Sequence, residues 1–383
     1  MPTEFCNGLH LDRHLPLVLP GAAPTGFTVH PLFHEIHARP FPVVDSALRV
    51  VHLVFLRGED ANIHAEEARL LAELWTQLGL EGEPGPSRQL EIPLGNSGLP
   101  LKLRVERHTE FTTYSFWAEG EFGVPFGEFP WPGVPHEWLS AVPGQLVGAA
   151  QLALHECELG IDREEVRHYF DGQRLVASTV VEESATVWTS YQLHEDGYNR
   201  FLIHNHDLQV CRAGRLVQRL LEMETYRSLA MLGLPLARAL WPRLTYLEKE
   251  LVSVFDALNT RQDMNLTAQQ DLLRQLTRLA DEIEHLRADS SYRFAATRAY
   301  GTLVEELLNQ LREEQISGLQ TLREFLDRRL PASLRTCETA AQRIESLSER
   351  VDRAGDLLRT RINLTLERQN QDLLASMDKR AGM

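Results

Sequence analysis

Short apolar runs and alternating apolar and polar positions fill the first half of the chain. The run "ALRVVHLVFL" at 47–56 is rich in Val and Leu and precedes Gly58, which predicts a buried strand. Leucines and alanines at helical spacing predict a helix over 62–80 that ends at Gly79. A short helical region is expected near 138–158. Further strands are expected at 88–94, 100–108, 111–120, 174–181, 185–193 and 198–204.

The pattern changes to helical spacing at about residue 207. A first helical segment continues until Pro235 interrupts it. The last helix opens at Pro331, because proline is tolerated in the first turn. Gly355 is the only later glycine before residue 380 and no further proline occurs, so this helix is about 70 Å long at 1.5 Å per residue. The helices between are expected at 243–259, 266–287 and 293–330.

Apolar side chains recur along the last helix at steps of three, four or seven residues. Several consecutive steps of four place this repeat between a heptad and an eleven-residue repeat. The stripe fits both an internal helix of an elongated bundle and a stalk that leads beyond the chain. Its members are Ile344, Leu347, Val351, Ala354, Leu358, Ile362, Leu366, Leu373 and Met377.

Together these elements predict an α+β protein, with an N-terminal mixed α/β sheet domain followed by an all-helical bundle and one very long C-terminal helix. The length of 383 residues is too great for one ordinary core, which supports two domains. The expected divisions are an irregular leader at 1–29, the α/β domain at 30–205, and the helical bundle at 206–383, whose stalk-like helix covers 331–379.

The chain is acidic, with a net charge of −15. A surface of this sign repels phosphate backbones, so nucleic acid is not expected as a partner. No stretch reaches the roughly 18–20 apolar residues that a membrane helix needs. The four cysteines are far apart and form no Cys-x-x-Cys pair, so neither a zinc knuckle nor a disulfide framework is predicted. Sequence motifs of nucleotide-binding and hydrolase sites are also missing from the sequence.

Three histidines, His30, His34 and His37, stand within eight positions beside Glu35 and Arg39. A zincin helix needs histidines four residues apart with Glu next to the first, whereas "HEIH" has a spacing of three. His34, His37 and an acidic residue could still supply metal ligands. The permanent charge of Arg39 opposes a metal ion. The metal role therefore stays open, and Glu35, His37 and Arg39 are expected to be polar anchors.

A second polar motif, "VERHTEF", contains Arg107, His108 and Glu110. Strand alternation places His108 and Glu110 on one face. A carboxylate beside a histidine can orient it for acid–base catalysis. The alternative is a buried ion-pair network, in which Glu35 pairs with Arg107 and Glu110 with Arg39.

A third set of charged residues lies in the helical segment "RLLEMETYRSL". Spacings of three and five residues predict an ion-paired or solvated helix face. The set consists of Arg219, Glu222, Glu224 and Arg227.

Several long motifs, including "HEIHARPF", "VERHTEF" and "GRLVQRLLEMETYRSLAMLGLPLAR", resemble a bacterial family of unknown function whose members are described as predicted membrane-anchored proteins. The resemblance covers about 27–383. Members of that family usually have Asn at the position of His34, which weakens a metal role for this histidine. The resemblance implies that hydrophobic segments follow in the full-length protein. It also implies a place at the cytoplasmic face of the inner membrane, with the present chain soluble as given.

The order of elements also resembles the CorA-type divalent-cation transporters, in which an N-terminal α/β domain and a helical bundle precede a long helix that leads into the membrane. This architectural resemblance implies a homo-oligomer, with a pentamer as the form found in CorA. It implies Mg²⁺ or another divalent cation as the ligand. The Gly-Met-Asn pore motif of those transporters is not in this sequence.

Three functional hypotheses follow. The first is a regulatory or assembly domain of a membrane-anchored, CorA-like protein, connected with divalent-cation transport. The second is an enzyme of unknown reaction, which requires His37, Arg39, His108 and Glu110 to converge in one cleft. The third is a helical scaffold that docks a partner protein through an exposed apolar stripe on the last helix. The missing catalytic motifs favour a role other than catalysis.

Overall fold

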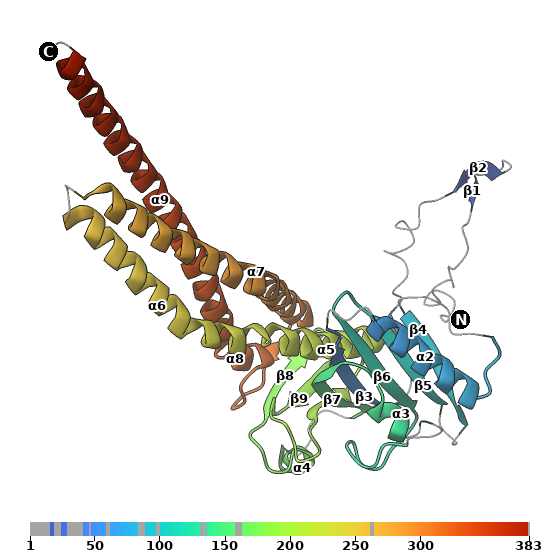
Figure 1. The fold of residues 1–383 in the computed structure, drawn as a ribbon. Helices are drawn as coiled ribbons and strands as arrows, with labels where there is room; N and C mark the ends of the chain where they lie inside the picture. Colours follow the sequence, from blue (N-terminus) through green and yellow to red (C-terminus); the bar gives the residue numbers. More distant parts are fainter. Residues whose placement is uncertain are drawn as a thin grey trace. The chain divides into compact units, whose positions relative to one another are not determined.

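The chain forms two compact units. The first contains Met1–Leu229 and Leu303–Asp327, and the second contains Ala230–Thr302 and Arg328–Met383. Figure 1 shows a β-sheet followed by long helices, so the predicted α+β class is confirmed. The computed structural model describes residues 16–18, 24–28, 41–45, 47–58, 62–82, 89–96, 100–130, 134, 136–157, 163–260 and 264–381.

A nine-stranded mixed sheet is the centre of the first unit. Its strands are β3 (Leu48–Leu56), β4 (Gln89–Asn96), β5 (Pro100–Arg107), β6 (Phe111–Glu119), β7 (Gln145–Glu156), β8 (Val176–Val180), β9 (Ala185–Thr189), β10 (Asn199–Asn205) and β11 (Glu314–Gln315). Their order is β11-β8-β9-β10-β7-β3-β6-β5-β4, in which β10 and β7 are parallel and the other pairs antiparallel. A separate two-stranded sheet pairs β1 (Pro16–Val18) with β2 (Pro24–Thr28).

Helices occur between strands in the first half of the described chain and account for most of the second half. They are α2 (Asn62–Gln77), α3 (His136–Ser140), α4 (Arg163–Tyr169), α5 (Val210–Ala230), α6 (Gly233–Thr260), α7 (Leu266–Leu311), α8 (Leu322–Asp327) and α9 (Leu330–Ala381). The very long last helix is confirmed.

Both faces of β3 are covered, which explains why its sequence is apolar with little alternation. On one face, Val51, Leu53 and Phe55 pack in a core cluster with α2 and with strands β4, β5 and β6. On the opposite face, the His52 side chain reaches Thr225 of α5.

The prediction of a helical region near 138–158 is wrong for most of its length. Only α3 is helical there, and β7 follows it in the middle of the sheet between β3 and β10. The segment "GAAQLAL" is rich in helix-forming alanines, but pairing on both sides overrides this preference. The small residues serve packing, because a Cβ at Gly148 would lie 3.1 Å from Ser228 Oγ of α5.

The helices also begin and end elsewhere than predicted. Pro235 lies in the first turn of α6, where its missing N–H costs no hydrogen bond, and α5 ends before it. The segments 266–287 and 293–330 are not separate helices, because α7 is continuous through the polar residues between them. Ser290 there donates to the Leu286 carbonyl at 2.6 Å. Arg312, with φ of 48°, ends α7 in the left-handed conformation.

The second unit is built from α6, the first part of α7, and α9. Leucines on one face of α6 share a core with the buried half of the α9 stripe, from Ile344 to Leu358. A Cβ at Gly301 of α7 would lie 2.5 Å from Leu334 Cδ1, so these helices approach closely. Arg343 of α9 donates to Glu248 of α6 at 2.8 Å.

Candidate functional site

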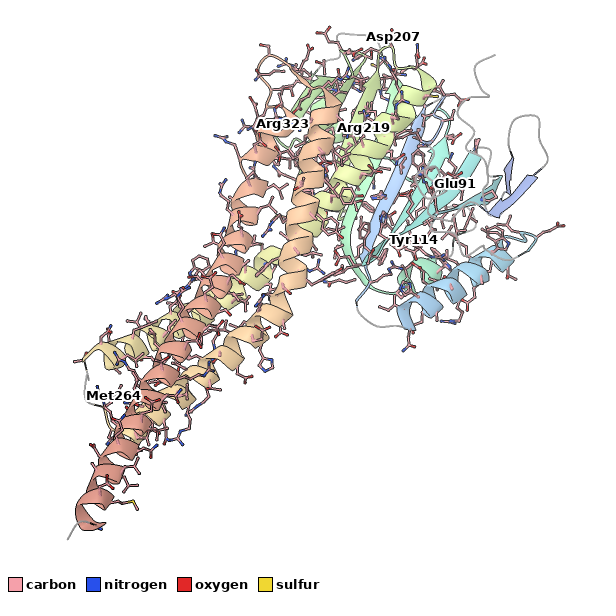
Figure 2. All side chains as sticks on the ribbon, turned by 90° about the horizontal axis from the view of Figure 1, so that it is seen from above. Glu91, Tyr114, Asp207, Arg219, Met264 and Arg323 are labelled. Atoms are coloured by element: carbon pink, nitrogen blue, oxygen red, sulfur yellow. The ribbon has the colours of Figure 1, made fainter. Side chains whose placement is uncertain are left out.

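A buried carboxylate, Glu67 of α2, organises the polar side chains on one face of the sheet. It accepts a hydrogen bond from Arg107 Nε at 2.8 Å and one from the Tyr114 hydroxyl at 2.9 Å. Arg57 Nη1 lies 3.9 Å from the same carboxylate and donates to His64 Nδ1 at 2.9 Å. Figure 2 shows Tyr114 on the strand beside α2. Two arginines and a phenol therefore surround one anion.

Burial shapes the electrostatics of this network. Glu67 is 2% exposed and Arg57 is 4% exposed. Burial, followed by the neighbouring Glu67 charge, raises the pKa of Tyr114, so the phenol is a proton donor at all ordinary pH values. Burial lowers the pKa of Arg57 and the Glu67 charge opposes this shift. The network holds α2, β5 and β6 together, because one oxygen of Glu67 accepts from Arg107 and the other accepts from Tyr114.

The three described residues of the predicted polar cluster have different partners. Arg107 binds Glu67, as above. The His108 ring stacks on Phe111 with centroids 4.1 Å apart. Glu110 is 9% exposed, and its backbone carbonyl accepts the Arg57 amide at 2.8 Å. The histidine stretch, with His30, His34, Glu35, His37 and Arg39, lies outside the described residues, and so do the predicted pairings with Glu35 and Arg39.

His52 occupies a second buried polar site, between the sheet and α5. Its ring nitrogens lie 2.7 Å from Ser115 Oγ and 2.8 Å from Thr225 Oγ1. Burial lowers the pKa of His52 to about 4, and the more distant charges of Glu106 and Glu224 offset only part of that effect. A cavity of about 30 Å³ beside it, also lined by Arg104 and Glu106, has room for about one water molecule. His52 is therefore a neutral hydrogen-bonding group at pH 7.

The four charged residues of α5 do not form one cluster. Glu224 binds Arg227 at 2.9 Å and Asn199 at 3.1 Å, while Glu222 accepts from Gln218 at 2.7 Å. Arg219 donates to the Gln310 carbonyl at 3.4 Å. The Arg227 guanidinium also lies 5.8 Å from the centre of the Tyr191 ring. Glu224 with Arg227 is thus a structural pair, and Arg219 belongs to a different surface.

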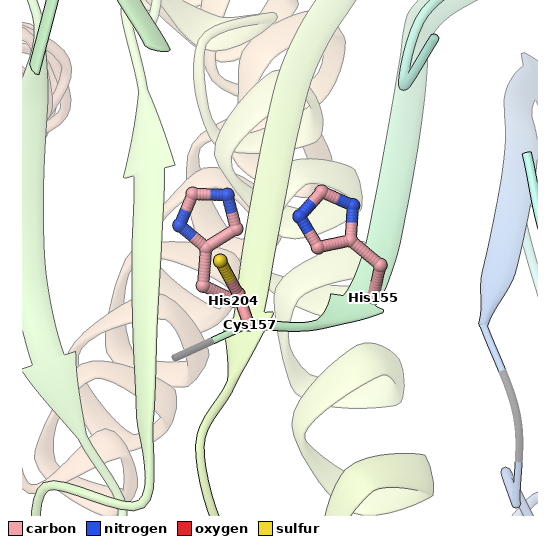
Figure 3. A group of neighbouring side chains, drawn as sticks. All are labelled: His155, Cys157 and His204. Atoms are coloured by element: carbon pink, nitrogen blue, oxygen red, sulfur yellow. The ribbon is translucent and has the colours of Figure 1, made fainter. Parts of the chain in front are cut away.

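One group has the composition of a metal site. Figure 3 shows His155, Cys157 and His204 close together. The two histidines are register partners on the parallel strands β7 and β10, and Cys157 follows β7. Donor atoms of the three residues lie within 4.8 Å of one another. Nitrogen and sulfur donors suit Zn²⁺ or copper far better than Mg²⁺.

The hydrogen bonding of His204 does not fit a prepared metal site. Trp188 donates its indole N–H to His204 Nδ1 at 3.1 Å. Because indole can only donate, a neutral His204 ring carries its proton on Nε2, the remaining nitrogen. A metal-bound histidine normally donates its second N–H to a carboxylate or carbonyl instead. The rings of His155 and His204 also stack at 21° with centroids 4.9 Å apart.

The same histidines are neutral at pH 7. Burial, followed by the neighbouring His155 and His206, lowers the pKa of His204 to about 3. Burial also lowers the pKa of His155. The pair is an aromatic stack within the sheet. Sequence reasoning missed this group because its members come from two strands, which only the β7–β10 register brings together.

The C-terminal part of α9 carries several exposed apolar side chains. Leu366, Leu373, Leu374 and Met377, here called the distal stripe, are 40%, 59%, 63% and 59% exposed. These four side chains share one face of the helix. Among the helices that the structure describes, none is both long enough and apolar enough to cross a membrane.

Fold and sites together define an α+β protein whose polar residues on the sheet are mostly structural and whose last helix is exposed at 366–378. The chain belongs to the family described as "Protein of unknown function (DUF3422)", which matches residues 30–383. No curated protein and no solved structure gives a significant match to the chain.

Proposed function

We propose that this chain is an assembly domain in which the distal stripe of α9 binds a second copy of the same chain, so that the protein forms a homo-oligomer. The observation that carries the proposal is that the apolar face of α9 continues past the helices that cover it. The core part of this face is buried as far as Leu358, which is 0% exposed.

Contacts near the ends of α6 and α7 mark where the cover stops. Arg361 Nη1 donates to the Leu258 carbonyl at 2.8 Å, and Gln269 Nε2 donates to Thr365 Oγ1 at 3.3 Å. Residues 366–378 are then all exposed. Burial of exposed leucines lowers the free energy by roughly 25 cal/mol for each Å² of apolar surface that is removed from water. A partner that covers the distal stripe therefore has a substantial driving force.

Two features favour a second copy as that partner. The stripe is continuous with a face that already packs against helices of this same chain. The segment 359–381 has five basic and three acidic residues, whereas the chain as a whole has a charge of −15. The end of α9 is thus attracted to acidic surfaces, and another copy offers one.

We expect Leu373→Lys to convert the oligomer to monomer, because a charge at the centre of the distal stripe must be desolvated on association. The matched control is Leu364→Lys. The exposed fraction of Leu364 is 54%, similar to the 59% of Leu373. Leu364 lies nine residues, or two and a half turns, from Leu373 and therefore on the opposite face of the helix. Light scattering coupled to size exclusion reads the molar mass of each variant at equal concentration.

Two results would contradict the assembly proposal. One is a parent chain that is monomeric at tens of micromolar. The other is an equal loss of mass in Leu364→Lys and Leu373→Lys.

We further infer that this oligomer serves a membrane-anchored, CorA-like protein at the cytoplasmic face of the membrane and responds to a divalent cation. The order of sheet, helical bundle and long helix supports this inference, as does the acidic charge. This inference concerns the membrane location and the cation response of the oligomer, and it does not depend on the role of the distal stripe.

We expect millimolar Mg²⁺ to raise the melting temperature or the molar mass of the parent chain, compared with NaCl of equal ionic strength. Bound cations stabilise the state that binds them by mass action. Melting curves and light scattering that are the same in Mg²⁺, NaCl and EDTA would remove the cation from the proposal and leave the Leu373 experiment unaffected.

A further inference from the structure

Four arginines surround a cavity of about 430 Å³ in the first unit. Arg212, Arg215 and Arg219 belong to one face of α5, at spacings of three and four, and Arg312 follows α7. Figure 2 shows Arg219 on α5. The remaining lining residues are Val181, Glu182, Asn309 and Gln310.

Only one carboxylate is among these lining residues, and it already forms ion pairs with two of the arginines. Glu182, in the turn between β8 and β9, lies 2.5 Å from Arg312 Nη1 and 3.6 Å from Arg212 Nη1. Its two oxygens therefore compensate the two arginines on either side of the cavity.

The other two arginines lack such a partner. Within the described part of the chain, no carboxylate forms an ion pair with Arg215 or Arg219. Arg219 donates to the Gln310 backbone carbonyl, and the Arg215 guanidinium lies 5.6 Å from the centre of the Phe41 ring. Two positive charges of the cavity lining are thus without an ion-paired carboxylate among the described residues.

This arrangement is costly for the fold. Burial lowers the pKa of Arg219, and the nearby Arg215 and Arg312 charges lower it further while Glu222 opposes them. Arg212 stands in the first turn of α5, where the helix dipole disfavours a cation. An anion bound among these arginines would offset both costs.

The backbone around the cavity is strained as well. Val181, Glu182 and Glu183 have φ of 53°, 59° and 62°. Side-chain-bearing residues rarely adopt this left-handed conformation, least of all a β-branched valine. Such strain collects at binding sites, where the surrounding structure holds it.

We propose that this cavity binds a phosphorylated small molecule, with Arg215 and Arg219 as the ligands of its phosphate groups. Guanidinium groups bind phosphate through two parallel N–H···O bonds, which lysine cannot form. The cavity volume falls within the usual range for small-molecule sites, roughly 300–1,000 Å³. The site is independent of the α9 assembly surface.

Isothermal titration of the full chain with inorganic pyrophosphate tests the proposal, at fixed physiological salt so that non-specific attraction is screened. We expect Arg215→Gln with Arg219→Gln to weaken binding by about tenfold or more, since each loses a charge-assisted contact. The control is Arg174→Gln, which removes one charge from an exposed arginine at the other end of β8 from the Glu182 turn.

A second pair of variants separates binding from folding. Arg215→Lys with Arg219→Lys keeps the charge and should weaken pyrophosphate less than the glutamine pair does. The glutamine pair is expected to melt no lower than the parent, because it removes crowded like charges. Glutamine variants that melt much lower, with lysine variants that bind as the parent does, would show that the arginines are structural and overturn the proposal.

A vesicle-binding experiment distinguishes a soluble phosphorylated ligand from the phosphate of a lipid headgroup. Sedimentation with phosphatidylcholine vesicles, with and without phosphatidylglycerol, is compared for the parent and the glutamine pair. Pyrophosphate binding that the glutamine pair loses supports a soluble ligand, and vesicle binding that the same pair loses supports a lipid phosphate. Binding to neither probe, or equal binding by the parent, the glutamine pair and Arg174→Gln, overturns the proposal.

Discussion

Glu67→Gln is expected to lower the free energy of unfolding by about 3–5 kcal/mol, the usual cost of removing one partner from a buried ion pair. The substitution keeps the shape of the side chain and a hydrogen-bond acceptor for Tyr114. It removes the negative charge that lies 3.9 Å from Arg57, and Arg57 is 4% exposed and cannot recover the loss from water. Urea denaturation followed by tryptophan fluorescence measures the change.

The same helix provides the control for this prediction. Glu73 accepts from Arg69 at 2.9 Å in an exposed pair four residues apart. Glu73→Gln should change stability by less than about 0.5 kcal/mol, because surface pairs of this kind contribute little. Similar effects of the two substitutions would show that burial does not govern the Glu67 network.

Acidification is expected to destabilise the first unit through His52. An unfolded histidine has a pKa near 6.5, whereas that of buried His52 is about 4. The unfolded state therefore binds the proton more tightly, and stability falls as pH falls. The loss begins near pH 6.5, is complete near pH 4, and amounts to about 3 kcal/mol for this residue. His204, with a pKa of about 3, adds a loss that continues to lower pH.

The test compares unfolding free energies between pH 7 and pH 4. His52→Gln should flatten the dependence, because an amide can still bond Ser115 and Thr225 but does not titrate. His168→Gln, at an exposed position of α4, serves as the control and should keep the slope of the parent. An unchanged slope in His52→Gln would place the acid sensitivity elsewhere.

The elements with strong patterns were predicted well. Helix α2 and strand β3 have long runs whose period leaves one interpretation, and the structure has both where they were expected. Strand β7 was missed because its alanines and glycine are small where α5 packs closely against the strand. This tertiary contact cannot be recognised from a single sequence. Helix α7 was split in two because a short polar stretch looked like a break, although Ser290 bonds within the helix.

The candidate sites show the same limit. Arg107 was singled out, but Glu67 was not, although a glutamate among Leu70, Leu71 and Leu74 on the buried face of α2 was the available signal. The arginines around the 430 Å³ cavity come from α5 and from the residue after α7, which are nearly a hundred positions apart. Only the tertiary structure brings these arginines together, and no sequence spacing predicts that they meet.

The return of residues 303–327 to the first unit has a consequence for synthesis. Glu314 pairs with Thr179 of β8, and Ser178 donates to Glu313 at 2.7 Å, so a late segment covers the edge of an early sheet. A ribosome adding about 5–20 residues per second needs on the order of ten seconds to make the chain between Leu229 and Asp327. During that interval the β8 edge is an open template for pairing with other chains. We therefore expect newly made protein to be most prone to aggregation while the β8 edge is uncovered.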